Sequence, residues 1–283
     1  MSLSESSRQA ARTLRSKVGG MLPARSQYLL WQRLVPRLGL GRALGHRVPA
    51  ATDVSRVASI EQWPRSVLSD PAELEPRLAA LGINAEFAPI LPERLHRYAG
   101  DGIQFSQYPS QFSRYLAFVG ERGVASYVEI GVDHGGTFLI TTTYLNRLQT
   151  LERATAVDRF EVPNLRRYPG PARHTDVLRV DSTSSRLARY LDDSDPFDLA
   201  LIDGDHSERG CKRDFELISE HARMIALHDI VGANTPGVRA VWQWLRREHA
   251  GDYDFHEFCD QYPEVEQARG ERYLGIGLAV RRA

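Results

Sequence analysis

The pattern of apolar and polar positions changes near residue 127. From there, short apolar runs alternate with segments whose apolar residues recur at helical spacing, which is typical of strands alternating with amphipathic helices. Expected strands cover residues 126–131, 153–158, 176–180, 197–202, 223–228, 253–258 and 273–280. Expected helices cover residues 136–149, 183–191, 207–221 and 237–249. Repeated strand–helix units predict an α/β fold around a parallel sheet with right-handed crossovers.

The end of the chain departs from this alternation. The last two expected strands, 253–258 and 273–280, are joined by the sequence DQYPEVEQARGE. This connection is too polar and too interrupted to predict a crossover helix, so we expect no helix in it. A closing hairpin follows, in which one strand runs antiparallel to the rest of the sheet.

Residues 1–100 are predicted to form a helical N-terminal appendage or lid, and residues 101–283 to form the main domain. The clearest helix of the appendage covers residues 69–82, where Asp70 can cap the start and Gly82 ends it. Further helices are expected at residues 92–99 and 109–121. Residues 26–40 carry helical spacing but contain a proline, so we interpret them as a short helix that packs on the main domain or on a second subunit. The alternative is a basic amphipathic segment that meets an anionic surface.

Charge is distributed unevenly although the whole chain has a net charge of zero. Residues 1–50 hold nine arginine or lysine residues and one acid, a net charge of +8, so the remainder carries −8. The overall neutrality argues against a general nucleic-acid binder. Arginine is abundant along the whole chain, and only Lys17 and Lys212 are lysines, so arginine content is discounted as a functional signal.

The cysteine content and the hydropathy pattern indicate the cellular setting. Cys211 and Cys259 are the only cysteines, which predicts no disulfide framework and suits a reducing compartment. No apolar run reaches the ~18 residues of a transmembrane helix. The N-terminus lacks the apolar core of a secretory signal. We therefore expect a cytoplasmic protein without a transmembrane segment.

The sequence YVEIGVDHGGT at residues 127–137 is the most informative stretch of the chain. An apolar run leads into a turn in which Gly131, Gly135 and Gly136 permit a close backbone approach to a ligand. The spacing differs from the G-x-G-x-x-G of dinucleotide-binding loops. Asp133 would repel a pyrophosphate, and with Glu129 it favours a ligand that is cationic or rich in hydroxyl and amino donors. S-adenosylmethionine (SAM) fits this description.

Acidic residues also follow the other central strands. In a doubly wound sheet, ligands bind beyond the carboxyl ends of the strands. The residues found there are Asp158, Asp181 with Ser182, the sequence DGDHS at residues 203–207, and His228 with Asp229. Asp158 lies a little over twenty residues beyond the glycine turn, where an acid can accept hydrogen bonds from ribose hydroxyls. One acid at each of five strand ends is hard to explain as solvated surface.

These motifs resemble those of the class I SAM-dependent methyltransferases, and the resemblance covers about residues 100–283. The sequence E-x-G-x-x-x-G-G at 129–136 resembles their first motif. The sequence FDLALIDGDHSERGCKRDFEL at 197–217 is similar to that of a subgroup containing small-molecule and sugar O-methyltransferases and cephalosporin-hydroxylase-like proteins. The resemblance implies a Rossmann-like sheet of seven strands in the order 3-2-1-4-5-7-6. It also implies SAM as the cofactor and methyl transfer to a small-molecule acceptor, most simply at a hydroxyl oxygen, with nitrogen left open.

The resemblance further implies which residues bind the cofactor. These are Glu129, Gly131, Asp133, Gly135, Gly136, Thr137, Asp158, Arg159, Asp181, Ser182 and Asp203. Related O-methyltransferases bind Mg²⁺ through acids after the fourth and fifth strands, and Asp203 and Asp229 match two of those positions. His228 stands where many relatives have an acid, and Ile230 offers no ligand. A site with His228 would favour Mn²⁺, Zn²⁺ or Fe²⁺ over Mg²⁺.

Methyl transfer needs alignment of the reactants and removal of a proton from the acceptor. His206 is the first candidate for the general base, because an unperturbed imidazole titrates near neutrality. Its structural alternative is a residue that caps the helix at 207–221. His228 is the second candidate, and its alternative is a buried histidine bonded to the backbone.

Two other functions remain open. One is a non-catalytic SAM-binding scaffold whose helical N-terminus binds a partner or a second copy of the chain. The other is a nicotinamide-dependent oxidoreductase, which would require a third glycine in dinucleotide spacing and no Asp133.

Overall fold

The structure is a computed structural model of the chain, and it describes residues 52–282. The predicted helix at residues 26–40, its contact with a second subunit and the basic segment as a whole lie outside the described residues. No helix within residues 52–282 has the length and apolar character needed to cross a membrane.

A single seven-stranded sheet forms the centre of the described fold, in the order β3-β2-β1-β4-β5-β7-β6. Its strands are β1 (Ser126–Ile130), β2 (Arg153–Asp158), β3 (His174–Arg179), β4 (Phe197–Ile202), β5 (Ala222–His228), β6 (Tyr253–Phe258) and β7 (Ile276–Arg281). The first five strands pair in parallel, and β7 pairs antiparallel with both β5 and β6. The predicted Rossmann-like sheet and its antiparallel closing hairpin are therefore confirmed.

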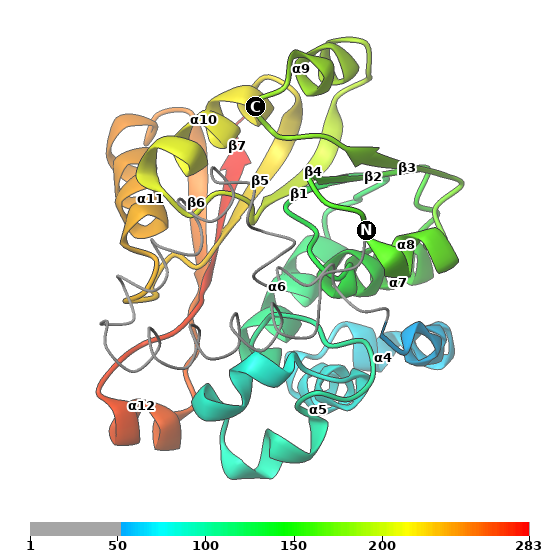
Figure 1. The fold of residues 1–283 in the computed structure, drawn as a ribbon, viewed down its shortest axis with the longest axis vertical. Helices are drawn as coiled ribbons and strands as arrows, with labels where there is room; N and C mark the ends of the chain where they lie inside the picture. Colours follow the sequence, from blue (N-terminus) through cyan, green and yellow to red (C-terminus); the bar gives the residue numbers. More distant parts are fainter. Residues whose placement is uncertain (1–51, 283) are drawn as a thin grey trace, which may run out of the picture. The chain divides into compact units, whose positions relative to one another are not determined.

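Helices cover both faces of the sheet, as Figure 1 shows. The main-domain helices are α6 (Pro109–Gly120), α7 (Gly136–Leu148), α8 (Pro163–Arg167), α9 (Ser185–Asp192), α10 (Glu208–Ser219), α11 (Pro236–Glu248) and α12 (Pro263–Arg269). One apolar cluster joins α6 and α7 to one face of the sheet. A second cluster joins α9, α10 and α11 to the other face.

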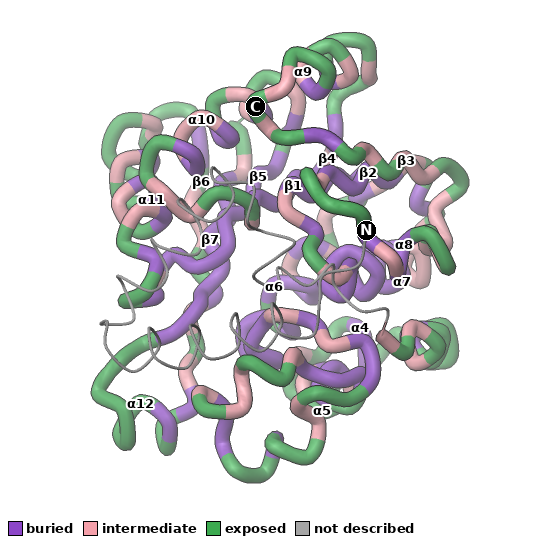
Figure 2. Tube along the Cα trace, viewed as in Figure 1, coloured by how far each residue is buried: buried purple, intermediate pink, exposed green. Residues whose placement is uncertain are grey.

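Burial on both faces explains why the central strands are nearly all apolar. In β4, Leu199 and Leu201 pack in the cluster with α6 and α7, whereas Ala200 and Ile202 pack in the cluster with α9, α10 and α11. Strands buried on both faces need continuous apolar runs rather than alternating ones. Figure 2 shows the contrast with the edge strand β3, which is largely exposed or half-buried.

The described part of the N-terminal appendage is helical and packs on α6 and α7. It comprises η2 (Val54–Gln62), α4 (Arg65–Leu68), α5 (Pro71–Leu81), η3 (Ala85–Ile90) and η4 (Glu93–Tyr98), of which the three labelled η are 3-10 helices. As predicted, α5 is capped by Asp70, whose side chain accepts a hydrogen bond from the Ala72 amide, and it ends at Gly82. These elements share the apolar cluster of α6 and α7. The domain boundary at residue 100 remains a prediction.

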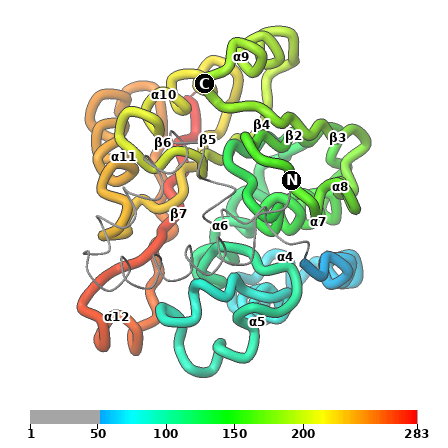
Figure 3. The backbone as a smooth tube through the Cα atoms, viewed as in Figure 1, coloured from blue at the N-terminus to red at the C-terminus, as the bar shows by residue number. Residues whose placement is uncertain are grey.

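The prediction of no helix between the last two strands was wrong, because α12 lies in this connection (Figure 3). The local signals for a short helix are present. Pro263 occupies the first turn, Glu264 and Glu266 are favourably placed near the helix N-terminus, and Gly270 ends the helix with a φ of 67°. The seven-residue helix is too short for a crossover, so the connection still returns the chain as a hairpin.

We predict that Tyr144→Phe destabilises the protein by about 1–2 kcal/mol, because it leaves a buried carbonyl without a partner. Tyr144 in α7 is buried, and its hydroxyl donates a 2.7 Å hydrogen bond to the Leu68 carbonyl of the appendage. Urea unfolding of the purified variant measures the difference. Arg65→Ala is the matched control, since it removes an exposed hydrogen bond between the same two parts of the chain, to the Leu148 carbonyl. An equal loss in both variants would contradict the prediction.

Candidate functional site

The loop after β1 brings its backbone against the end of β4, and Gly131 makes this approach feasible. Gly131 has a φ of 90°, and a Cβ placed on it would lie 2.3 Å from the Asp203 carbonyl oxygen. Gly136 begins α7, where a Cβ would lie 2.8 Å from the Phe105 Cα. The loop therefore depends on these glycines for close packing as well as for backbone freedom. Thr137, the next residue of α7, is buried.

Asp158 at the end of β2 holds the β1 loop in place. One of its carboxylate oxygens accepts hydrogen bonds from the amides of Val132 and Asp133, each at 3.0 Å. The other oxygen accepts a 2.7 Å hydrogen bond from the Phe160 amide. Burial raises the pKa of this carboxyl, and the three amide donors oppose that rise. The structure thus joins two predicted cofactor contacts, Asp158 at the end of β2 and Asp133 in the loop after β1.

Asp133 and His134 at the tip of this loop form a close pair. Asp133 has a left-handed φ of 47°, and its carboxylate lies 2.5 Å from Nδ1 of His134. This contact raises the pKa of His134 despite partial burial. The buried Asn164 side chain of α8 donates a 2.6 Å hydrogen bond to the His134 carbonyl, which holds the tip of the loop in place. Sequence reasoning missed Asn164, since an isolated asparagine in a segment without periodicity gives no signal.

Two aspartates and two histidines from the ends of β4 and β5 form what we call the acid–histidine cluster: Asp203, His206, His228 and Asp229. Oδ1 of Asp203 lies 3.0 Å from Nε2 of His206 and 3.1 Å from Nδ1 of His228. The Asp229 carboxylate lies 3.8 Å from Nδ1 of His206 and 3.5 Å from Nδ1 of His228. The structure therefore brings both candidate bases onto one carboxylate.

The two histidines of the cluster differ in access. The side chain of His206 is 24% exposed, whereas that of His228 is only 4% exposed. The helix cap predicted as an alternative role for His206 belongs instead to Ser207, whose hydroxyl accepts a hydrogen bond from the Gly210 amide. His206 thus has no capping role and is the more accessible of the two histidines.

The charges within the cluster support one another. Burial alone would raise the pKa of Asp203, but His228 and His206 outweigh it and hold that pKa well below its usual value. Burial likewise would lower the pKa of both histidines, but the carboxylates raise it, to about 9 for His228. Opposite charges held within hydrogen-bonding distance favour the charged form of each partner.

The cluster does not fit the divalent metal that the resemblance implied for Asp203 and Asp229. Mg²⁺ needs near-octahedral oxygen ligands, and Oδ1 of Asp203 is already engaged by both histidines. Over residues 52–282, no group of three or more His, Cys, Asp or Glu side chains is arranged to hold a metal ion.

Asp181 and Ser182 follow the end of β3, and Ser182 contacts the middle of α10. The Asp181 carboxylate accepts hydrogen bonds from the amide and hydroxyl of Thr183, at 2.9 and 2.6 Å. The Ser182 hydroxyl accepts a 3.0 Å hydrogen bond from Arg213. These hydrogen bonds from Thr183 are the main cause that lowers the pKa of Asp181, and the charges of Arg159 and Arg213 lower it further. Arg159 lies just past β2 and is exposed.

Glu129 lies inside the protein rather than at the end of its strand. It is 1% exposed and accepts a 2.5 Å hydrogen bond from the Tyr127 hydroxyl. Burial raises the pKa of Glu129 well above its usual value. Its predicted contact with the cofactor remains a prediction.

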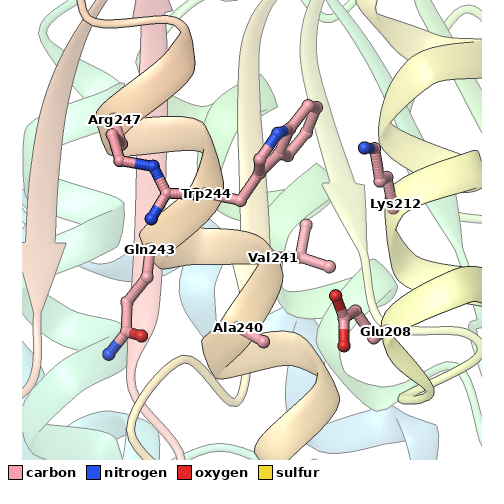
Figure 4. Close-up of a pocket in the computed structure, with 7 residues that line it drawn as sticks. All are labelled: Glu208, Lys212, Ala240, Val241, Gln243, Trp244 and Arg247. Carbon is pink, nitrogen blue, oxygen red and sulfur yellow. The ribbon is translucent and has the colours of Figure 1, made fainter.

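A pocket of about 280 Å³ opens elsewhere, between α10 and α11 (Figure 4). Lys212 points toward the indole of Trp244, with its Nζ 3.9 Å from the ring centroid. None of the residues predicted from sequence to bind cofactor, metal or acceptor lines this pocket. We therefore place the candidate site at the carboxyl ends of β1, β2, β4 and β5.

Comparison with known proteins identifies a domain of known type in the chain. Residues 128–230 match the family model of a methyltransferase domain, which confirms the methyltransferase resemblance. The match runs from within β1 to just past β5, so it contains the acid–histidine cluster and the glycine loop. None of the curated proteins matches the chain.

Solved structures similar to this fold include several O-methyltransferases. Cofactor-bound Rv0187 from MTB has 20% identity and a TM-score of 0.45, with 70% of this chain and 86% of that chain covered. The O-methyltransferase from Bacillus cereus in complex with SAH has 15% identity and a TM-score of 0.45, covering 81% and 98%. TomG from Streptomyces achromogenes, an O-methyltransferase involved in tomaymycin synthesis, has 14% identity and a TM-score of 0.43, covering 93% and 100%.

We predict that His228 stays protonated through neutral pH and that Asp203→Asn lowers its pKa. The wild-type pKa of about 9 lies above the ordinary value of 6.5. Protonated His228 therefore contributes stability that is fully present below pH 6.5 and is lost as pH rises through about 9. NMR titration of the imidazole measures both values. A wild-type pKa at or below 6.5 would show that the cluster is not held by charge.

Proposed function

We propose that this chain is a SAM-dependent methyltransferase that methylates a hydroxyl group of a small-molecule acceptor. The methyltransferase domain match supplies the class of reaction. The choice of cofactor rests on the hydrogen bonds that the Val132 and Asp133 amides of the β1 loop donate to Asp158. These bonds place Asp158, an acid that can bind ribose hydroxyls, next to a loop in which Asp133 disfavours a pyrophosphate.

The residues around the β1 loop would hold SAM. Asp158 would accept hydrogen bonds from the ribose hydroxyls, and Gly131 and Gly136 would let the loop backbone approach the ligand closely. Asp181 and Ser182, at the end of β3, would contact the adenine. When bound, SAM supplies a methyl group already activated by a sulfonium. The protein's remaining tasks are to orient the acceptor and to take its proton.

His206 is our candidate for the general base. Its Nε2 is held by Asp203 at 3.0 Å, and its Nδ1 is 3.8 Å from Asp229, too far for a hydrogen bond of ordinary length. Nδ1 is therefore the ring atom available to accept a proton from a hydroxyl. His228 is buried and serves to hold Asp203 rather than to meet the acceptor.

Ligand titration tests the cofactor. We expect S-adenosylhomocysteine (SAH) to bind and NAD not to bind in isothermal titration calorimetry. Asp158→Ala should weaken SAH by at least about 100-fold, since hydrogen bonds to a charged group contribute ~1.5–3 kcal/mol each. Asp193→Asn, an exposed acid at the end of α9, is the control and should leave the affinity unchanged. Binding of NAD without SAH would refute the proposal, and SAH binding without methyl transfer to any acceptor would favour a non-catalytic scaffold.

A pH profile tests the base. Methyl transfer is followed as SAH release with a panel of hydroxylated small molecules. A general base must be deprotonated, and the pKa of His206 is raised above 6.5, so we expect kcat/KM to increase with pH above 6.5. His206→Asn should lower kcat by about 10²–10⁴-fold with little change in SAH affinity. A folded variant with unchanged kcat and pH profile would exclude His206 as the base.

A further inference from the structure

Within residues 52–282, two of the four non-glycine residues with a left-handed φ belong to the candidate site. The non-glycine residues with a left-handed φ are Gln104 (57°), Asp133 (47°), Asp229 (68°) and Leu274 (59°). Asp229 belongs to the acid–histidine cluster, and Leu274 is followed by Gly275 at a φ of 87°. Such conformations persist only where surrounding contacts enforce them. Contacts around Leu274 therefore hold it at its φ of 59°.

The turn at Leu274 and Gly275, just before β7, is bonded to the residues that follow Asp229. The Ile230 amide donates to the Gly275 carbonyl at 3.2 Å, and the Val231 amide donates to the Leu274 carbonyl at 3.0 Å. The packing is also close, because a Cβ on Gly275 would lie 3.0 Å from a methyl carbon of Val231. The strained turn thus fixes the backbone of the two residues that follow Asp229.

The side chain of Gln111 in α6 also forms hydrogen bonds with this turn. It is fully buried, and its Oε1 accepts a 2.9 Å hydrogen bond from the Gly275 amide. Its Nε2 donates to the carbonyls of Tyr273 at 3.2 Å and Asp260 at 3.0 Å. One side chain therefore holds the residues on both sides of Leu274, across more than 140 positions of sequence.

We propose that Gln111 is a positioning residue for the acid–histidine cluster. By fixing both flanks of Leu274, it keeps the strained turn closed against Ile230 and Val231. Through its bonds to Ile230 and Val231, the turn fixes the backbone that follows Asp229, whose carboxylate faces His206 and His228. The consequence for methyl transfer rests on the proposed function, whereas the effect on the backbone does not.

Amide hydrogen exchange of the full-length chain without ligand, followed by NMR, tests the proposal. In Gln111→Leu, the Ile230 and Val231 amides should exchange at least about tenfold faster, because local opening of the turn exposes them. The Gly131 amide, which donates to the Val157 carbonyl in the β1–β2 part of the sheet, should exchange as in the wild type. Equal acceleration at all three amides would mean only a global loss of stability and would overturn the proposal.

Gln261→Leu is the matched control. Gln261 also bonds the Tyr273 carbonyl, together with the Tyr273 amide and the Cys259 carbonyl, but no hydrogen bond joins it to Gly275. We expect exchange at Ile230 and Val231 to change less than about threefold in this variant. Acceleration equal to that in Gln111→Leu would overturn the proposal, because general loosening of the β6–β7 connection would then explain both.

Two further measurements complete the test. If Gln111→Leu does not fold, Gln111→Glu keeps the acceptor for Gly275 but sets a carboxylate oxygen against two carbonyls, and the same selective acceleration is expected. In the folded variant, SAH affinity should stay within about threefold while kcat falls, because the substitution does not contact the β1 loop.

Failure of SAH to bind the wild type would refute the proposed function but leave the exchange result standing. Unchanged exchange at Ile230 and Val231 would refute the role of Gln111 itself.

Discussion

Parallel pairing of β1 with β2 on one side and β4 on the other is the constraint on which the site depends. It brings the carboxyl ends of three strands to one edge of the sheet, and β5 extends that edge. Residues from separate strand–helix units then meet within hydrogen-bonding distance. Asp158 reaches the loop after β1, and Asp203 reaches His228 at the end of β5. Without this strand pairing, these residues would not lie within hydrogen-bonding distance of one another.

Concentrating acids at one edge carries an electrostatic cost, and the structure offsets it in two ways. Asp158 is surrounded by backbone amides that donate to both of its oxygens. Asp203 is paired with two histidines, which keep it ionised although it is buried. In this arrangement both imidazoles engage Oδ1 of Asp203, which is one of the oxygens that could otherwise bind a divalent metal. The same pairing holds the ring of His206 with one nitrogen engaged and the other available, which suits the proton transfer that we propose for it.

Much of the fold and part of the site could be predicted from the sequence. Apolar periodicity gave all seven strands to within a few residues, and the acids after β2, β4 and β5 lie at the expected edge. The burial of Glu129 could not be predicted, because an acid near the end of a strand can be exposed or buried, and its partner, the Tyr127 hydroxyl, is set by the fold. The helix α12 was missed because its start and stop signals cover only seven residues. Gln111 and Asn164 gave no signal because their partners are backbone groups brought close only by the tertiary fold.

A crystal structure with SAH bound tests the central claim most directly. The account predicts the ribose hydroxyls on Asp158, the adenine beside Asp181 and Ser182, and the sulfur on the side of the acid–histidine cluster, within reach of an acceptor held by His206. SAH bound without contact to Asp158, for instance in the pocket between α10 and α11, would contradict it.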